Sequence, residues 1–151
     1  MRPPAAARRP GALQFGQRGP MTTPRPHDNP FVNYLDLRFD EEDADHVVCR
    51  LPVAESVRNR TGQVHAGALI AMADMMASIL ARQGVNVGPN GEGFPLAIDV
   101  HAVLVGNQSN GEVRGESRIV RKGRRVTVVR TRLTGTDDRL LAEVTTTHVP
   151  A

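Results

Sequence analysis

The sequence predicts an α+β fold in which a curved antiparallel sheet wraps around one long central helix. Three observations lead to this prediction: an apolar helical segment near the middle of the chain, a series of strand-like segments after it, and the short turns between those segments. Turns this short favour antiparallel pairing, at least among the last three strands. One helix lying across one face of such a sheet is an α+β arrangement, not a doubly wound fold.

The central helix is predicted over residues 66–83. The segment consists mostly of good helix formers, Pro is absent from residues 58–88, and Gly84 is placed to end the helix. Eighteen residues at 1.5 Å each give a rod of about 27 Å. The rod is apolar nearly all the way round, which is typical of a buried helix. Its one acid is Asp74, and burying an ionised carboxylate is costly unless something uses or satisfies it.

The chain before this helix begins with a basic arm. Residues 1–30 contain five Arg and many Pro, with no acid before Asp28. This composition cannot form a packed core, which predicts a disordered arm ahead of one folded domain over residues 31–151. Three interpretations of the arm stay open: a flexible start with Met21 as the real initiator, a transit peptide, and a tether for nucleic acid or membrane.

One strand and two polar segments are predicted between the arm and the helix. Residues 31–38 form a short helix or a lead-in strand, and the acidic residues 40–45 form a turn. Residues 46–53 are rich in β-branched side chains, which predicts a strand. The polar residues 54–63 form the loop that leads into the helix.

Four strands are predicted after the helix. A loop rich in Gly and Asn, residues 84–93, comes first. The first two strands alternate so that one face of each turns inward. The strands are expected at residues 95–105, 112–121, 126–134 and 140–149, with Ile98, Val100, Ala102 and Leu104 sharing a face of the first and Val113, Gly115, Ser117 and Ile119 facing inward on the second.

The composition excludes several classes of protein. No apolar run in the 151 residues reaches the ~18 needed to span a bilayer, so a cytoplasmic protein with no membrane partner is predicted. Cys49 is the one cysteine, which excludes an internal disulfide and a Cys-based metal site. Scarce aromatic residues argue against a nucleic-acid partner. His101 and His148 are isolated and lack the spacing of metal ligands, so no metal and no cofactor are expected.

A motif spans the loop and the start of the helix. Asn59, Gly62, His65-Ala66-Gly67 and Asp74 form the pattern N-x-x-G-x-x-H-A-G-x-x-x-x-x-x-D. Together with the order of strands and turns that follows, this pattern resembles the hotdog-fold acyl-CoA thioesterases of the phenylacetic-acid-degradation (PaaI-type) family, over about residues 31–149. The resemblance implies a hotdog fold, hydrolysis of acyl-CoA thioesters to free acid and coenzyme A, and a homodimer or a dimer of dimers.

The chain departs from that family at two positions. Ala66 stands where the family commonly has the first Gly of His-Gly-Gly. The Cβ of Ala66 is expected to narrow the substrate channel. The backbone N–H is kept. Ala97 stands where some relatives place a hydroxyl residue that helps to position water. A step assisted by Ser or Thr is therefore in doubt here.

Thioester hydrolysis needs an attacking group and hydrogen-bond donors for the oxyanion. The start of a helix supplies free N–H groups and partial positive charge. We expect the N–H of Ala66, with or without that of Gly67, to polarise the thioester carbonyl and Asn59 to hold the water or the carbonyl. Asp74 is the expected general base, or a nucleophile through a mixed anhydride. His65 either fixes the loop or acts as a base.

The spacing of these residues predicts a shared site. Ala66 and Asp74 lie eight residues apart in the sequence, or about 12 Å along one helix. Groups that act on one carbonyl must lie within ~3–4 Å of it. Two antiparallel copies would place Asp74 of one chain beside Ala66 of the other, which predicts a two-fold dimer with two sites at its interface.

Two further groups of residues are candidates for substrate binding. The turn between the second and third strands after the helix is basic, and it either binds the phosphates of coenzyme A or is simply solvated. A cluster of Met residues in the helix is core by default, and part of it is expected to line an acyl tunnel. The residues concerned are Arg121, Lys122, Arg124 and Arg125 in the turn, and Met75 with its neighbours Met72 and Met76 in the helix.

Other interpretations stay open. Asp74 could instead be a buried acid satisfied by local N–H groups. The protein as a whole could bind acyl thioesters without turnover, or hydrate enoyl thioesters, a reaction that usually pairs an Asp with a nearby His. The chain has His65 well upstream of Asp74 and no closer His in the sequence. A role in binding nucleic acid would rest on residues 1–30 alone.

Overall fold

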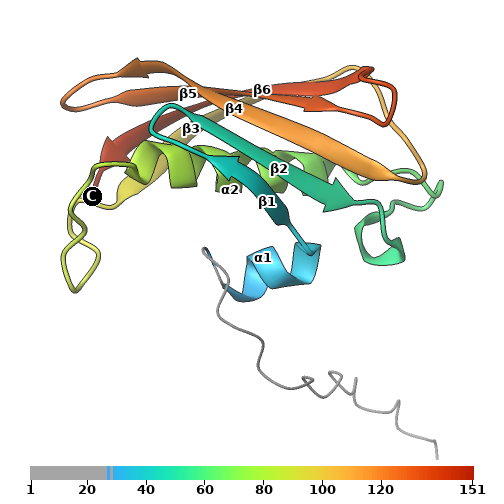
Figure 1. Ribbon diagram of the computed structural model, residues 1–151, viewed down its shortest axis with the longest axis horizontal. Coiled ribbons are helices and arrows are strands. Elements are labelled where there is room, and N and C mark those ends of the chain that lie inside the picture. Colours follow the sequence, from blue (N-terminus) through green and yellow to red (C-terminus); the bar gives the residue numbers. More distant parts are fainter. Residues whose placement is uncertain (1–26, 28) are drawn as a thin grey trace, which may run out of the picture.

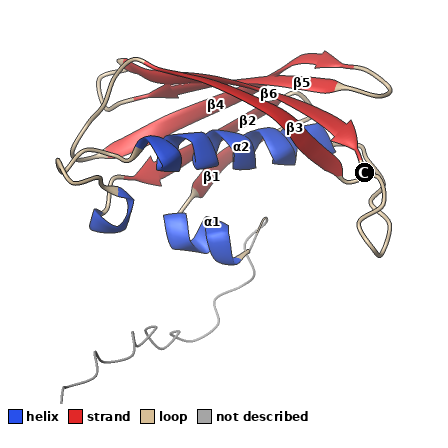
Figure 2. Ribbon diagram, turned by 180° about the vertical axis from the view of Figure 1, so that it is seen from behind, coloured by secondary structure: helices blue, strands red, loops and turns tan. Residues whose placement is uncertain are grey.

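The computed structural model describes His27 and residues 29–151 (Figure 1). Most of the predicted arm, residues 1–26 and 28, lies outside the described residues. The described chain forms a six-stranded antiparallel sheet with one long helix along one face. Figures 1 and 2 show a short second helix on the same side of the sheet. The predicted α+β arrangement is confirmed.

The chain enters the fold through helix α1, Pro30–Leu35. Asn29 caps this helix, because its side-chain oxygen accepts hydrogen bonds from the amides of Phe31 and Val32. Asp36 ends it in the left-handed conformation, with φ of 53°. Of the two alternatives for residues 31–38, the helix is therefore correct for most of the segment.

A strand follows that the sequence did not predict. Strand β1, Arg38–Glu42, occupies part of the segment predicted as an acidic turn at 40–45, so that prediction is wrong for residues 40–42. Four of its five side chains are exposed, and it lies at the edge of the sheet beside β2, His46–Pro52. Its side chains make cross-strand ion pairs and only Phe39 packs partly against the core, so no hydrophobic alternation marks it.

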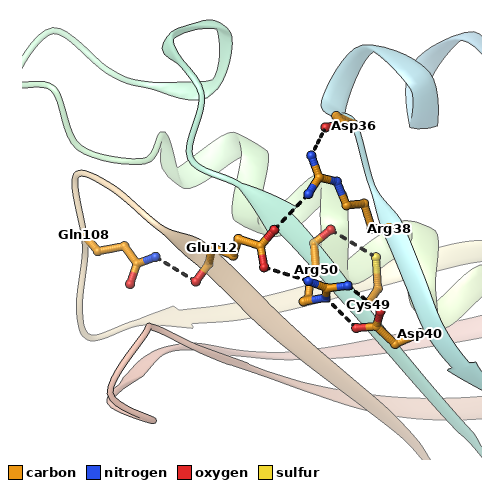
Figure 3. A network of polar contacts seen from close by, with 7 residues as sticks. All are labelled: Asp36, Arg38, Asp40, Cys49, Arg50, Gln108 and Glu112. Atoms are coloured by element: carbon orange, nitrogen blue, oxygen red, sulfur yellow. Dashed lines mark hydrogen bonds and ion pairs between the residues drawn. The ribbon is translucent and has the colours of Figure 1, made fainter.

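The ion pairs of this edge form a network (Figure 3). Arg50 of β2 binds Asp40 through two hydrogen bonds of 2.7 and 2.8 Å and Glu112 through one of 2.9 Å. Arg38 binds Asp36 at 2.8 Å and Glu112 at 3.1 Å. The network thereby ties α1 and β1 to the first residue of β4.

The central helix α2, Ala66–Arg82, confirms the predicted helix to within one residue. Its packing face closely approaches the sheet at Gly115, where an added Cβ would lie 2.6 Å from the Sδ of Met76. The helix is not buried all round as predicted, since one strip remains half-buried or exposed. That strip consists of Ala66, Gly67, Ile70, Ala71, Asp74, Met75 and Ser78. No helix in the described part of the chain is long and apolar enough to cross a bilayer.

The remaining strands follow in the predicted order, and all pair antiparallel. They are β3 (Pro95–Leu104), β4 (Glu112–Lys122), β5 (Thr127–Thr134) and β6 (Leu140–Pro150). The sheet order is β1-β2-β4-β5-β6-β3, so β3 crosses over to pair with β6 at the far edge. A bulge between Ala97 and Asp99 takes Ile98 out of the predicted alternation, and Ile98 is 63% exposed.

Candidate functional site

The loop before α2 is held by Asn59. Its Oδ1 accepts hydrogen bonds from the amide and hydroxyl of Thr61, at 2.9 and 2.7 Å, and from the amide of Gln63 at 3.1 Å. Gly62 takes a φ of +76°, a left-handed conformation that favours glycine. The Oδ1 of Asn59 is thereby fully engaged, which leaves the Nδ2 group of this half-buried side chain as its remaining donor.

The amino end of α2 is capped by His65. Its Nδ1 accepts a hydrogen bond of 2.9 Å from the amide of Gly67. Ala66, the first helical residue, is exposed, and its amide donates to no group in the described residues. Of the two amides predicted to polarise a carbonyl, that of Ala66 is therefore free and that of Gly67 is already bound.

Asp74 lies in the middle of α2, on the half-buried strip. Its Oδ1 is buried and makes no hydrogen bond to any described residue. The local N–H groups of the helix therefore do not satisfy this oxygen. In this respect the structure differs from the alternative in which local N–H groups satisfy a buried Asp74. A buried acceptor without a partner is rare, because leaving it unsatisfied costs about 1–3 kcal/mol.

A histidine that the motif does not include lies on the facing sheet. His148 is on the inner face of β6 and is 1% exposed. Burial lowers the pKa of this imidazole, while the carboxylate of Asp74 and the carbonyl of Pro95 act in the opposite direction. The sequence alternation of β6 places residue 148 inward, but no local pattern links it to Asp74, so sequence reasoning treated it as an isolated strand residue.

Two clefts flank the strip of α2. One, of about 240 Å³, lies at the amino end and is lined by His65, Gly67 and Ala71 together with Phe31 and Tyr34 of α1. The other, of about 340 Å³, lies at the carboxyl half. Its walls include Met75, Ser78, Ile79, Arg82 and Phe94. Of the predicted site residues, His65 and Gly67 therefore border the first cleft and Met75 borders the second, and both clefts are mainly apolar.

The largest cleft described, about 480 Å³, is elsewhere. It lies beside β1, with Arg38, Asp40 and Arg50 in its walls, and it contains none of the predicted site residues. Arg50 and Asp40 already bind each other, and Arg38 binds Asp36 and Glu112, in the network of Figure 3. We therefore place the candidate site at α2, where unpartnered polar groups and apolar space occur together.

The predicted basic turn lies at the opposite end of α2 from Ala66. Arg121, Lys122, Arg124 and Arg125 are all exposed. Lys122 donates a hydrogen bond to the carbonyl of Gln83, the residue after the helix. Within one chain the structure brings Ala66, Gly67, His65 and Asn59 together at one end of α2. It keeps Asp74 about 12 Å along the helix from Ala66 and the basic turn at the far end.

Cys49 takes no part in this arrangement. It lies buried in β2 as a free thiol. Burial raises the pKa of this thiol to about 12. The side chain is therefore neutral at physiological pH and acts as a small apolar core residue.

A family model and two mycobacterial proteins match the sequence. A family described as "Domain of unknown function (DUF4442)" matches residues 27–101. The "Putative esterase Rv1847" of Mycobacterium tuberculosis (strain H37Rv) is 30% identical over 113 residues, which are 75% of this chain and 80% of that protein. The corresponding protein of strain CDC 1551, "Putative esterase MT1895", matches to the same extent.

Solved structures share the fold. The structure of the putative esterase Rv1847/MT1895 is 28% identical, with a TM-score of 0.74 over 82% of this chain and 97% of that chain. A mutant of the thioesterase SAV0944 from Staphylococcus aureus is 19% identical, with a TM-score of 0.76 over 81% and 98%. A hypothetical thioesterase from Streptococcus pneumoniae, solved with coenzyme A, is 16% identical, with a TM-score of 0.70 over 80% and 90%.

These likenesses confirm the predicted fold, a sheet wrapped around one long helix as in the hotdog thioesterases. The sequence match to the mycobacterial protein extends over most of both chains. The chain therefore belongs to the family of the putative esterase Rv1847/MT1895 of Mycobacterium tuberculosis, a family with the hotdog fold.

Proposed function

We propose that the protein hydrolyses acyl-CoA thioesters, as a PaaI-type member of the hotdog thioesterases. The observation that carries the proposal is the pair of unpartnered polar groups on one exposed strip of α2. These are the buried Oδ1 of Asp74 and the free amide of Ala66. A carboxylate supplies the base and a helix amino end supplies the oxyanion donor that this reaction needs.

The reaction proceeds in two steps. Asp74 takes a proton from water, and the oxygen attacks the thioester carbonyl carbon while the amide of Ala66 stabilises the oxyanion. The C–S bond then breaks, and the leaving thiolate takes the proton from Asp74. A nucleophilic route through a mixed anhydride uses the same residues. The Nδ2 of Asn59 is the second donor near the carbonyl, held in place by the three bonds at its Oδ1.

The site is shared between two copies of the chain in this proposal. One subunit separates Asp74 from Ala66 by about 12 Å, which is too far for both to act on one carbonyl. The edge strand β3 favours self-association, because Leu96, Ile98 and Val100 are exposed on it. The exposed strip of α2 lies beside that edge and would meet its antiparallel copy across a two-fold axis.

The substrate is proposed from three features. Exposed cations of the basic turn suit the phosphates of coenzyme A, and a structural relative was solved with that molecule. Across an antiparallel pair of α2 helices, the turn at the carboxyl end of one helix would approach the amino end of the other. The cleft beside Phe31, Tyr34 and Ala71 would take the acyl group, since apolar and aromatic walls suit such a ligand.

A panel of acyl-CoA esters tests the proposal by thiol release. The wild-type protein should turn over at least one ester. Asp74→Asn, which keeps the size of the side chain and removes its basicity, should reduce kcat by a factor of ~10²–10⁴. Binding of an ester without turnover by the wild-type protein would favour the acyl-binding alternative. Equal turnover by the wild-type protein and by Asp74→Asn would mean that Asp74 takes no part in the reaction.

A further inference from the structure

His148 is a buried titratable residue on the sheet face that α2 covers. Its Nε2 lies 2.9 Å from the hydroxyl of Thr146. Its Nδ1 is buried and makes no hydrogen bond within the described residues. An imidazole with an unsatisfied nitrogen is costly in a core, and apolar residues of similar size would fill the position without that cost.

The register of β6 places His148 opposite Ala97, the position at which the resemblance implies a residue that helps to position water. His148 pairs with Ala97 on β3 and with Thr127 on β5. Directly opposed residues of antiparallel strands share a face, so the imidazole and the methyl group of Ala97 both face the helix side. Ala97 contributes no polar group there. The imidazole is therefore the polar side chain directly opposite that position on the β3–β6 ladder.

Asp74 is the charged group that acts on this histidine. The pKa of His148 is affected by one charge in the described chain, the carboxylate of Asp74, which favours the protonated ring against the effect of burial. The Oδ1 of Asp74 and the Nδ1 of His148 are both buried and both lack a hydrogen-bond partner. One atom is an acceptor and the other can donate, so the two groups are complementary.

We propose that His148 is a positioning residue for Asp74. The hydroxyl of Thr146 donates to Nε2, which leaves the proton of the neutral ring on Nδ1. Nδ1–H then orients the Asp74 carboxylate through the water that Asp74 activates. His148 itself exchanges no proton with the substrate. This inference rests on the proposed function for its role in catalysis, but the pairing of the two side chains is measurable without any turnover.

Histidine NMR tests the pairing independently of activity. The ring nitrogens of His148, assigned by comparison with His148→Asn, should show the Nδ1–H tautomer in the wild-type protein. The Asp74→Asn variant should shift these signals and lower the pKa of the ring, because it removes the negative charge that favours protonation. An Nε2–H tautomer, or identical ring signals with and without the Asp74 charge, would overturn the proposal even if the protein is an active hydrolase.

Kinetics test the positioning role. His148→Leu should lower kcat by about tenfold or more with KM little changed, since a hydrogen bond to a charged group is lost. His148→Asn keeps a donor close to the place of Nδ1 and should restore part of kcat. In an Asp74→Asn background, His148→Leu should have almost no further effect. A loss of the same size in that background would mean that His148 acts on stability alone.

Thr146 offers a milder probe of the tautomer, with a matched control. Thr146→Val removes the hydroxyl that donates to Nε2 and should lower kcat. Thr131→Val removes an equally buried hydroxyl on β5, where Thr131 binds Ser117 at 2.7 Å, and should leave kcat unchanged. Equal kcat losses in both variants would contradict the role given to Thr146.

Discussion

The Nδ1 of His65 accepts the amide hydrogen of Gly67 across 2.9 Å, and this bond caps the central helix. The bond assigns different roles to two neighbouring amides. The N–H of Gly67 caps the helix, and the N–H of Ala66 has no partner in the described residues. This bond supports the role of His65 in fixing the helix start, and its role as a base stays a prediction.

Ala66→Pro should abolish most of the activity without unfolding the helix. Proline lacks the N–H but is well tolerated at the first helical position, and His65 already has the extended conformation, φ −69° and ψ 134°, that a following proline requires. We expect kcat to fall by ~10²–10³, as for loss of one oxyanion donor. Ala66→Gly is the control, because it keeps the amide. Steady-state kinetics and circular dichroism together check both halves of the prediction.

Mixing inactive subunits should restore activity if the site is shared. Asp74→Asn and Ala66→Pro subunits each lack one half of the proposed site. Random re-pairing yields heterodimers that hold one intact site each, which gives about a quarter of wild-type activity. Thiol release after joint refolding measures this recovery. No recovery from mixtures that light scattering shows to be dimeric would mean that each chain holds its own complete site.

Charge reversal in the basic turn should raise KM selectively. Arg125→Glu places a negative charge where the proposal puts the phosphates of coenzyme A, so KM for acyl-CoA esters should rise severalfold. KM for small thioesters without phosphate should not change. Arg132→Glu, at an exposed position on β5, is the matched control. An equal change in KM for acyl-CoA esters and for small thioesters would mean that the basic turn does not bind the phosphates.

Gly115→Ala should destabilise the fold. The added Cβ would lie 2.6 Å from the Sδ of Met76 and 2.8 Å from the Cε of Met72, so these fully buried side chains would have to move within a packed core. Overpacking of this kind costs about 1–3 kcal/mol. Urea unfolding measures the loss. Met76→Ala in the same chain should relieve part of the cost, which a double-mutant cycle would detect as non-additivity.

Cys49 should make stability fall at high pH. The thiol has an ordinary pKa of 9.0 in the unfolded chain and a pKa of about 12 in the fold. Between these values the unfolded state binds fewer protons than the folded state, so the free energy of unfolding decreases as pH rises. Cys49→Ala should flatten this slope in urea titrations from pH 8 to 11. A thiol reagent at pH 8 should react with Cys49 only after unfolding.

The sequence predicts the main elements because their signals are local. The uniform apolar character of α2, the stop at Gly84 and the inward alternation of β4 each follow from neighbouring residues. Strand β1 escapes prediction because ion pairs such as Arg50 with Asp40 hold it, and these form between segments. The crossover of β3 to β6 likewise depends on packing around the whole helix.

The candidate site is likewise predicted only in part from the sequence. The motif places Ala66 and Asp74 on one helix and gives their spacing, which suffices to predict a dimer. It does not give the capping bond between His65 and Gly67, since either ring nitrogen or none could make it. His148 is separated from Asp74 by most of the sheet in sequence, so no local pattern shows that the Asp74 carboxylate acts on the pKa of this ring.

The unpaired edge of β3 also affects whether newly synthesised chains aggregate before they are fully assembled. In the part that the structure describes, β3 pairs with β6 alone, and its outer edge offers open backbone groups beside Ile98. Newly synthesised chains would associate with one another along this edge before they adopt the relative orientation of the proposed dimer. Rapid overexpression should therefore produce inclusion bodies. Expression at low temperature, which slows translation, should increase the yield of folded protein.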